Sequence, residues 1–292
     1  MSYIKFEEKL IKKGEFMSLL TSILENSGWV NVNSNVSAEG WIYQSKGENG
    51  KSNILINIRD GYDGHMKNSF STTSTRGFDI RPLISYTPAT SSGVTGVTVP
   101  PLSNTEYSRV FVGMGTDALY EDAELLIRYN CNKDRLVMTI TTLQLGCGTT
   151  FLTFGRPSDN VAKEYADTGT MYATQNAYRY AQGTWGIADR PTSVRTDIQL
   201  ITKPLGKSFV GSTIRMSEIA IMTDLEGYKG TINGMYVLDI DASSNNIDDI
   251  TIEDELGNQF KVMYLTPSSA TNYGTLIKNK AIAVCTRLAG EE

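Results

Sequence analysis

The segment that decides the fold lies near the C-terminus, in residues 227–284. It reads Gly227-Tyr-Lys-Gly-Thr-Ile-Asn-Gly-Met-Tyr-Val-Leu-Asp-Ile, passes through a polar loop, and resumes as Ile250-Thr-Ile-Glu-Asp-Glu-Leu-Gly-Asn-Gln-Phe-Lys-Val-Met-Tyr. β-Branched and aromatic residues tend to alternate with polar ones, and Asn, Asp and Gly interrupt the runs. This pattern is typical of strands with one buried face that are joined by tight turns. No residue in the segment is placed for catalysis. The segment therefore predicts a protein that acts by presenting a surface.

The size and composition of the chain indicate a folded, β-rich protein. Its 292 residues can bury a real core, as one large β domain or as two smaller ones. The apolar content of 40% and the charged content of 20% exclude wholesale disorder, and 26 Gly against 8 Pro suits a chain with many turns. The net charge of -5 offers no basic stripe, so we expect no nucleic-acid partner.

Cysteine usage and the first residues predict the compartment. Cys131, Cys147 and Cys285 are an odd and sparse set, which favours free thiols in a reducing cytoplasm over a disulfide framework. The start of the sequence has no apolar signal-peptide core, and no apolar run is long enough to cross a bilayer. We therefore expect a protein that is made in the cytoplasm and has no membrane segment.

The sequence predicts one amphipathic helix, over Glu15–Asn26. Its apolar residues recur at helical spacing on one face: Phe16, Leu19, Leu20, Ile23 and Leu24. Gly28 follows at the position of a C-terminal cap, and we expect Trp29 to fold back onto the apolar face.

The rest of the chain is predicted to be mainly β, in sandwich-like or barrel-like sheets with long ordered loops. The expected strands are Trp41–Gln44, Ile54–Ile58, Phe78–Ile80, Leu83–Tyr86, a hairpin of Glu124–Tyr129 with Arg135–Thr141, Phe151–Phe154, and a final β block from about Ile214. The tracts Asp60–Asn104 and Arg156–Gly206 are loop-rich, and only short strands fit in the first of them. Loops of such length are usually functional or ordered by a partner. We divide the chain into residues 1–200 and residues 201–292, with a single domain as the alternative.

Two stretches imitate nucleotide-binding motifs. Gly50-Lys51-Ser52 matches the end of a P-loop, but the motif requires Gly where Ser45 stands and a helix where a strand-like run follows. The tip of a polar hairpin explains it better.

In residues 110–118, Gly113, Gly115 and Ala118 have dinucleotide-fingerprint spacing, and Asp117–Ile127 could be helical. The chain does not continue with alternating strands and helices, so we favour a Gly-rich bend followed by a short helix or strand.

Other polar groups imitate metal and catalytic sites. Asp239-x-Asp241-x-Ser243-x-Asn245 resembles the start of a calcium loop, yet the sixth and twelfth positions are Ser and Ile, which excludes an EF-hand. Two interpretations of this stretch remain, namely solvated turn residues or a weak surface cation site. His65, the single histidine, lies near two loop carboxylates, which is a poor set for zinc or iron. We expect no cofactor, no metal and no catalysis.

Three features in order along the chain resemble structural proteins of tailed-bacteriophage virions. The first is the helix ending in Gly28-Trp29, followed by a strand, a glycine hairpin and Ile54-Leu-Ile-Asn-Ile. The second is Asn132-Lys-Asp-Arg-Leu-Val-Met, leading to Phe151-Leu-Thr-Phe-Gly. The third is Gly230-Thr-Ile-Asn-Gly-Met-Tyr-Val, followed by a strand pair and Ala281-Ile-Ala-Val. The chain departs from the group's pattern where Leu126-Ile-Arg-Tyr replaces a Trp-rich strand.

The resemblance implies a structural role and no catalytic residues. The chain would belong to the tail, neck or baseplate of a phage or phage-tail-like particle and would assemble in the cytoplasm of the bacterial host. Its partners would be other copies of itself and other virion proteins. Such assembly buries apolar surface between subunits and suits unpaired cysteines.

Aromatic residues in the two loop-rich tracts are the predicted subunit-interface anchors. They are Phe70, Phe78, Tyr86, Tyr172, Tyr178 and Trp185. The alternative function is a β-rich ligand-binding module, such as a carbohydrate-binding or receptor-binding domain. In that case Tyr172, Tyr178, Tyr180 and Trp185 would serve as stacking platforms.

Overall fold

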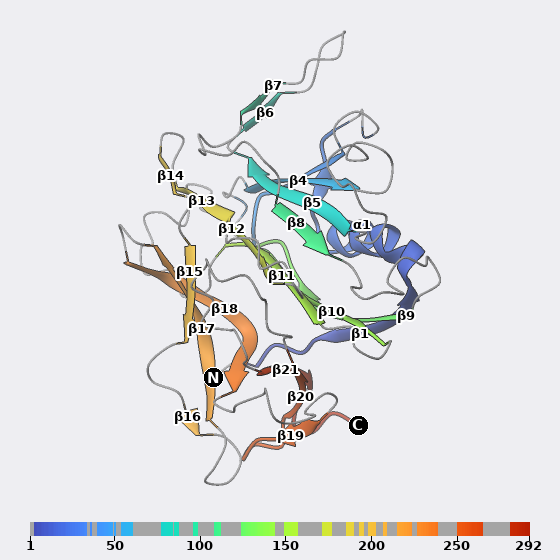
Figure 1. Cartoon of the computed structure of the whole chain (residues 1–292), viewed down its shortest axis with the longest axis vertical. Helices are drawn as coiled ribbons and strands as arrows, with labels where there is room; N and C mark the ends of the chain where they lie inside the picture. Colours follow the sequence, from blue (N-terminus) through green and yellow to red (C-terminus); the bar gives the residue numbers. More distant parts are fainter. Residues whose placement is uncertain are drawn as a thin grey trace.

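The protein is mainly β in the computed structural model. The model describes residues 3–33, 36, 40–48, 50, 54–60, 77–83, 85–87, 96–98, 108–111, 124–143, 149–156, 171–176, 185–189, 193–195, 198–202, 207–208, 215–223, 227–238, 250–264 and 281–292. Within these residues it consists of three antiparallel sheets, a small two-stranded hairpin and one N-terminal α-helix (Figure 1). The predicted fold class is therefore confirmed.

The first sheet, which we call the central sheet, joins the N-terminal strand to the middle of the chain. Its order is β1 (Glu7–Lys12), β9 (Glu124–Cys131), β10 (Arg135–Thr142), β11 (Thr149–Gly155), β12 (Met171–Asn176), β13 (Trp185–Asp189) and β14 (Ser193–Arg195). Every neighbouring pair is antiparallel, and β1 lies at one edge.

The second sheet, which we call the helix-side sheet, lies beside α1 (Phe16–Asn26) in Figure 1. Its order is β2 (Val30–Asn31), β3 (Trp41–Ser45), β4 (Ile54–Asp60), β5 (Gly77–Leu83) and β8 (Ser108–Phe111). A separate hairpin pairs β6 (Ser85–Thr87) with β7 (Gly96–Thr98). A short 3-10 turn, η1 (Lys13–Glu15), leads from β1 into α1.

The third sheet, which we call the C-terminal sheet, contains the segment that opened the sequence analysis. Its order is β15 (Ile198–Thr202), β17 (Arg215–Thr223), β18 (Gly227–Leu238), β21 (Ala281–Arg287), β20 (Gln259–Tyr264) and β19 (Thr251–Glu253), and β16 (Lys207–Ser208) also pairs with β17. The predicted strands of the final β block are thus confirmed as one antiparallel sheet.

The central sheet is the middle layer of the molecule. Successive residues of a strand point to opposite faces, and on β10 Leu136 and Met138 pack into the core shared with α1 and the helix-side sheet. Val137, between them, packs into a second core with residues of the C-terminal sheet such as Ile219 and Ile282. Figure 1 shows β9–β11 lying between the two other sheets. Both faces of the central sheet are therefore covered by the chain itself.

Helix α1 and its C-terminal turn match the sequence prediction. The side chains of Phe16, Leu20, Ile23 and Leu24 are buried, and Leu19 packs against them from a half-buried position. Gly28 adopts φ 86°, and the backbone N–H groups of Gly28 and Trp29 donate to the carbonyls of Glu25 and Leu24, both at 3.0 Å. These two bonds form a Schellman motif, which turns buried Trp29 back onto the helix.

The N-terminal segment fastens the C-terminal sheet to the central sheet. The Phe6 backbone N–H donates to the Cys285 carbonyl at 2.8 Å, and the Phe6 ring is buried between the two sheets. At Gly234 (φ 89°), a Cβ atom would come within 2.9 Å of the Phe6 ring, so glycine permits this close crossing. Immediately after Phe6 the chain becomes β1, so one short segment contacts both sheets.

A buried carboxylate organises the β19–β20 turn and holds the N-terminal end. Asp254 Oδ1 accepts the backbone N–H groups of Leu256 and Asn258, each at 2.9 Å, and its Oδ2 accepts from Asn258 Nδ2 at 2.9 Å. Burial opposes ionisation of Asp254, but hydrogen bonds from Asn258, Tyr3 and the turn backbone outweigh it and lower its pKa. The Tyr3 ring also packs edge-on against Phe260.

Several alternatives left by the sequence are decided by backbone conformation. The residues that follow the P-loop-like stretch form strand β4 rather than a helix, as predicted for a hairpin. Residues 124–127 belong to strand β9, so the helical alternative is wrong for them. His65, the calcium-loop-like stretch and residues 112–123 lie outside the described residues. In the part of the chain that the structure describes, no helix has the length and apolar character required to span a membrane.

We expect Leu20→Asp to unfold the protein or make it insoluble. Leu20 is fully buried in the core between the helix and two sheets, so a carboxylate there would lack a partner and cost about 3–5 kcal/mol. Ser18→Asp, on the exposed face of the same helix, should leave the urea unfolding midpoint nearly unchanged. Soluble, cooperatively folded Leu20→Asp protein would contradict this burial.

We expect Asp254→Asn to destabilise the protein by about 1–2 kcal/mol at pH 7, because the amide offers one acceptor where the carboxylate offers two. The folded-state pKa of Asp254 is lowered, so its contribution is complete above the unfolded pKa of about 3.9 and is lost as pH falls through the folded pKa. Urea midpoints measured from pH 7 to pH 2.5 should therefore converge for wild type and variant. Exposed Glu253→Gln is the matched control, and a gap that stays constant with pH would contradict the assignment.

Candidate functional site

Residues about a hundred positions apart in sequence meet where α1 ends against the β9–β10 turn. The Trp29 indole Nε1–H donates to the Asn132 carbonyl at 2.8 Å, and its ring packs perpendicular to Phe154 at a centroid distance of 5.7 Å. Ser27 Oγ donates to the Cys131 carbonyl at 3.3 Å. We call this contact region, with the loop described next, the helix-end junction.

The loop after β3 completes the junction. Ser45 Oγ donates to the Lys133 carbonyl, and Glu48 Oε1 accepts the Lys133 backbone N–H at 3.2 Å. The Glu48 backbone N–H in turn donates to Asp134 Oδ1 at 3.2 Å. Asn132 Oδ1 accepts the backbone N–H groups of Asp134 and Arg135, which fixes the turn from inside. Polar groups of three separate segments, the end of α1, the loop after β3 and the β9–β10 turn, are therefore hydrogen-bonded to one another.

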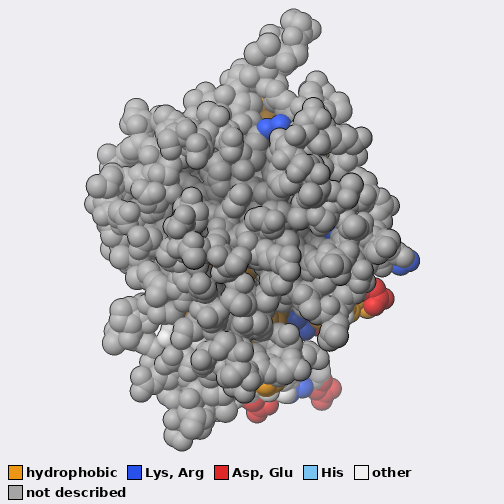
Figure 2. Space-filling view, viewed as in Figure 1, with side chains coloured by type: hydrophobic (Ala, Val, Ile, Leu, Met, Phe, Trp, Pro, Cys, Tyr) orange, Lys and Arg blue, Asp and Glu red, His pale blue; other side chains and the backbone are white. Residues whose placement is uncertain are grey.

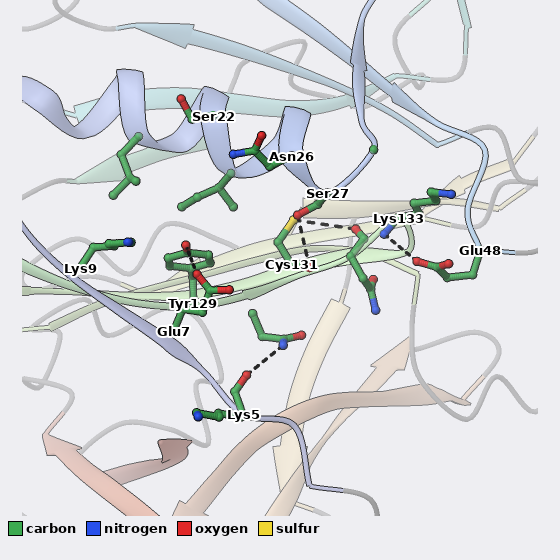
Figure 3. A pocket seen from close by; sticks show the side chains of 15 residues that line it. Lys5, Glu7, Lys9, Ser22, Asn26, Ser27, Glu48, Tyr129, Cys131 and Lys133 are labelled. Atoms are coloured by element: carbon green, nitrogen blue, oxygen red, sulfur yellow. Dashed lines mark hydrogen bonds between the residues drawn. The ribbon is translucent and has the colours of Figure 1, made fainter. Parts of the chain in front are cut away.

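A cleft of about 810 Å³ opens beside this junction (Figure 3). Its walls are Lys5 and β1, the stretch of α1 from Leu19 to its C-terminal turn, Glu48 of the loop after β3, and the end of β9 with the following turn. Figure 3 shows Lys9, Glu7 and Tyr129 on one side, with Ser22 and Asn26 of the helix opposite. The cleft is therefore lined mainly by polar side chains.

Most polar groups in the cleft already contact the chain. Tyr129 donates its hydroxyl to Glu7 Oε2, and Asn130 Nδ2 donates to the Lys5 carbonyl at 3.0 Å. Burial, followed by the contact with Glu7, raises the pKa of Tyr129. The Lys5 ammonium pairs with Glu291 at 2.7 Å. The raised pKa keeps the Tyr129 hydroxyl protonated, as the donor in its hydrogen bond to Glu7.

Burial disfavours the thiolate form of the cysteine in the cleft. Cys131 is free, and burial raises its pKa to about 12 despite a hydrogen bond with Ser27 and the nearby Arg135 charge. The reactive form of cysteine is the thiolate, which is scarce at neutral pH in such a site. Among the residues that the structure describes, no three His, Cys, Asp or Glu side chains are grouped to hold a metal ion.

The charged side chains coloured in Figure 2 alternate in sign. Acidic and basic groups lie beside one another along the right and lower margins of that face. The charges coloured on this face form no extended field of one sign, a mixture that suits contacts in which individual charges pair across an interface.

The structure describes the side chains of two of the six predicted interface anchors. Phe78 is 1% exposed and stacks on Phe16 at a centroid distance of 5.4 Å, so its ring packs within the chain's own core. Tyr86 is half-buried and donates its hydroxyl to Asn33 Oδ1 at 3.1 Å. Tyr172 and Trp185 lie on β12 and β13, for which only the backbone is described, and Phe70 and Tyr178 lie outside the described residues.

The sequence interpretation missed the residues of β1 that line the cleft. Glu7 and Lys9 belong to an edge strand whose residues are nearly all exposed, so the run lacks the alternation that marks a half-buried strand. The one unusual feature of this run in the sequence is its charge order, since Glu-Glu-Lys-Leu-Ile-Lys begins with two acidic residues and ends with a basic one.

We expect Trp29→Phe to destabilise the protein by about 1–3 kcal/mol, because the substitution removes the indole N–H that donates to the Asn132 carbonyl. Hydrogen exchange should accelerate in residues 27–29 and 132–135 together. Trp41→Phe is the matched control, since Trp41 packs against the same core from a half-buried position and does not contribute the bond to Asn132. Equal losses of stability in the two variants would contradict the role of that bond.

No family model matches this chain, and no curated protein matches it. A function for the chain must therefore come from its own residues and their arrangement.

Proposed function

We propose that this chain is a non-enzymatic structural subunit of a tailed-bacteriophage particle or a phage-tail-like particle, in the tail, neck or baseplate. It assembles in the cytoplasm of the bacterial host, with other copies of itself and other virion proteins as partners. The observation that carries the proposal is the helix-end junction. Residues from the first two features of the virion resemblance, Trp29 and Asn132, contact each other there at 2.8 Å.

The junction supports a framework role for these features. The glycine hairpin of the first feature begins at Ser45, which bonds to Lys133 of the second. Phe154 of the second feature packs against Trp29. Hydrogen-bonded groups that are fully engaged with one another hold layers in place. The residues that carry the resemblance thus define how the sheets are stacked, as expected for a subunit that acts through its shape and surfaces.

A ligand-binding β module, such as a carbohydrate-binding or receptor-binding domain, is the second candidate. The cleft beside β1 favours it, because about 810 Å³ falls within the size range of small-molecule sites and amide, hydroxyl and charged groups line the walls. The cleft ranks second because Tyr129 and Asn130, two of its polar side chains, already bond to the chain.

The proposal is tested on particles purified from the bacterium that carries the gene. We expect mass spectrometry to find the chain at the abundance of a structural protein, and antibodies against it to label the tail, neck or baseplate in electron micrographs. A host cytoplasmic protein of similar expression serves as the control for contamination. Absence of the chain from the particles, with specific retention of the isolated chain on a glycan array, would establish the second candidate instead.

A further inference from the structure

Among the strands that the structure describes, β1 forms one edge of the central sheet. It pairs with β9 on one side, and no strand of the described chain lies on its other side. Its side chains are exposed except for half-buried Ile11, and Leu10 is 59% exposed. An open edge presents backbone N–H and C=O groups that another strand can pair with.

The backbone contacts at the two ends of β1 show which residues face the open side. The Phe6 N–H bonds to Cys285 and the Lys12 N–H bonds to Glu15, so both point away from β9. In an antiparallel ladder, backbone groups of alternate residues point to the same side of the strand. Glu8 and Leu10, which lie at alternate positions between Phe6 and Lys12, therefore direct their N–H and C=O groups toward the open edge.

The side chains of β1 are complementary to a second copy of the same strand. Glu8, Leu10 and Lys12 share one face. When two β1 strands run antiparallel with Leu10 opposite Leu10, Glu8 of each copy, which also pairs with Arg128 of its own chain at 3.1 Å, stands opposite Lys12 of the other. In the same register Lys9 stands opposite Ile11 on the other face. Opposite charges directly across a strand pair stabilise it.

Neighbouring registers lack this match. In an antiparallel ladder, two residues that lie opposite each other direct their backbone groups either both toward the partner strand or both away from it. Alternative registers of the β1 pair therefore differ by shifts that move the two-fold axis by one residue. One such shift places Lys9 opposite Lys9. The other places Ile11 opposite Ile11 and Leu10 opposite Lys12, so no opposite charges meet within β1. Like charges directly opposite each other destabilise a strand pair. Charges on an edge strand usually prevent pairing, whereas here they select one register.

We propose that β1 is the contact strand of a homodimer, in which the β1 strands of two copies pair antiparallel about a two-fold axis through Leu10. The two central sheets then form one continuous sheet. Such an interface is isologous, as in most dimers. A pair of short strands covers less than the roughly 1,600 Å² of a standard interface, so dimer formation depends on concentration. The inference goes beyond the proposed function and is tested on the isolated chain, whereas particle membership is tested on purified particles.

The test is sedimentation velocity of the full chain over a range of concentrations. We expect the wild-type chain to form a dimer as concentration rises, with slowed hydrogen exchange at the Glu8 and Leu10 amides. Leu10→Pro removes an N–H that faces the open edge and spares the pairing with β9, so this variant should stay monomeric. Circular dichroism verifies that it folds.

Charge reversal tests the register even if the proline variant fails to fold. Lys12→Glu places like charges opposite each other at both symmetry-related positions, and we expect it to weaken dimerisation by roughly tenfold. Lys9→Glu makes the same change in net charge opposite Ile11 and should dimerise like the wild type. A wild-type chain that is monomeric at every concentration, or a dimer that Lys12→Glu leaves unchanged, would overturn the proposal.

Discussion

Burial on both faces restricts which side chains the inner strands of the central sheet can hold. Every residue of β11 is buried, so each polar side chain in these inner strands needs a partner within the protein. Thr153 Oγ1 donates to the Leu136 carbonyl at 2.9 Å, and the buried Arg128 guanidinium pairs with Glu8 at 3.1 Å. The described inner strands β10 and β11 are thus packed on both faces, whereas most side chains of the edge strand β1 are exposed.

Two polar contacts set how the layers lie on one another. The bond from Trp29 to Asn132 fixes the end of α1 against the central sheet. Asp254 holds the N-terminal end through Tyr3, and a few residues later Phe6 is buried between the central sheet and the C-terminal sheet. Apolar packing alone tolerates small sliding of one layer over another, whereas a hydrogen bond between buried groups is lost when they separate. Polar groups at these two points therefore give the stacked sheets a defined alignment.

Elements with one buried face could be predicted from the sequence. The apolar stripe of α1 and the glycine after it predicted both the helix and the return of Trp29, because local spacing and capping determine them. The hairpin of β9 and β10 was also evident. Strand β1 was missed, since nearly all its side chains are exposed and carry no periodic signal. The stacking order of the sheets was beyond prediction as well, because contacts such as Phe6 with Cys285 join the two ends of the chain.

Residue type predicts burial better than it predicts contact with a partner. Phe78, chosen as an aromatic interface anchor, lies in the core against Phe16, because a large apolar ring is stabilised by any dry surroundings, including the protein's own interior. The charged run of β1 was passed over, although its position at the edge of a sheet leaves the Glu8 and Leu10 backbone groups facing outward. Whether a group is free to meet another molecule depends on its place in the sheet order. In this protein, pairing between distant segments of the chain sets that order, and a local pattern of residue types does not reveal it.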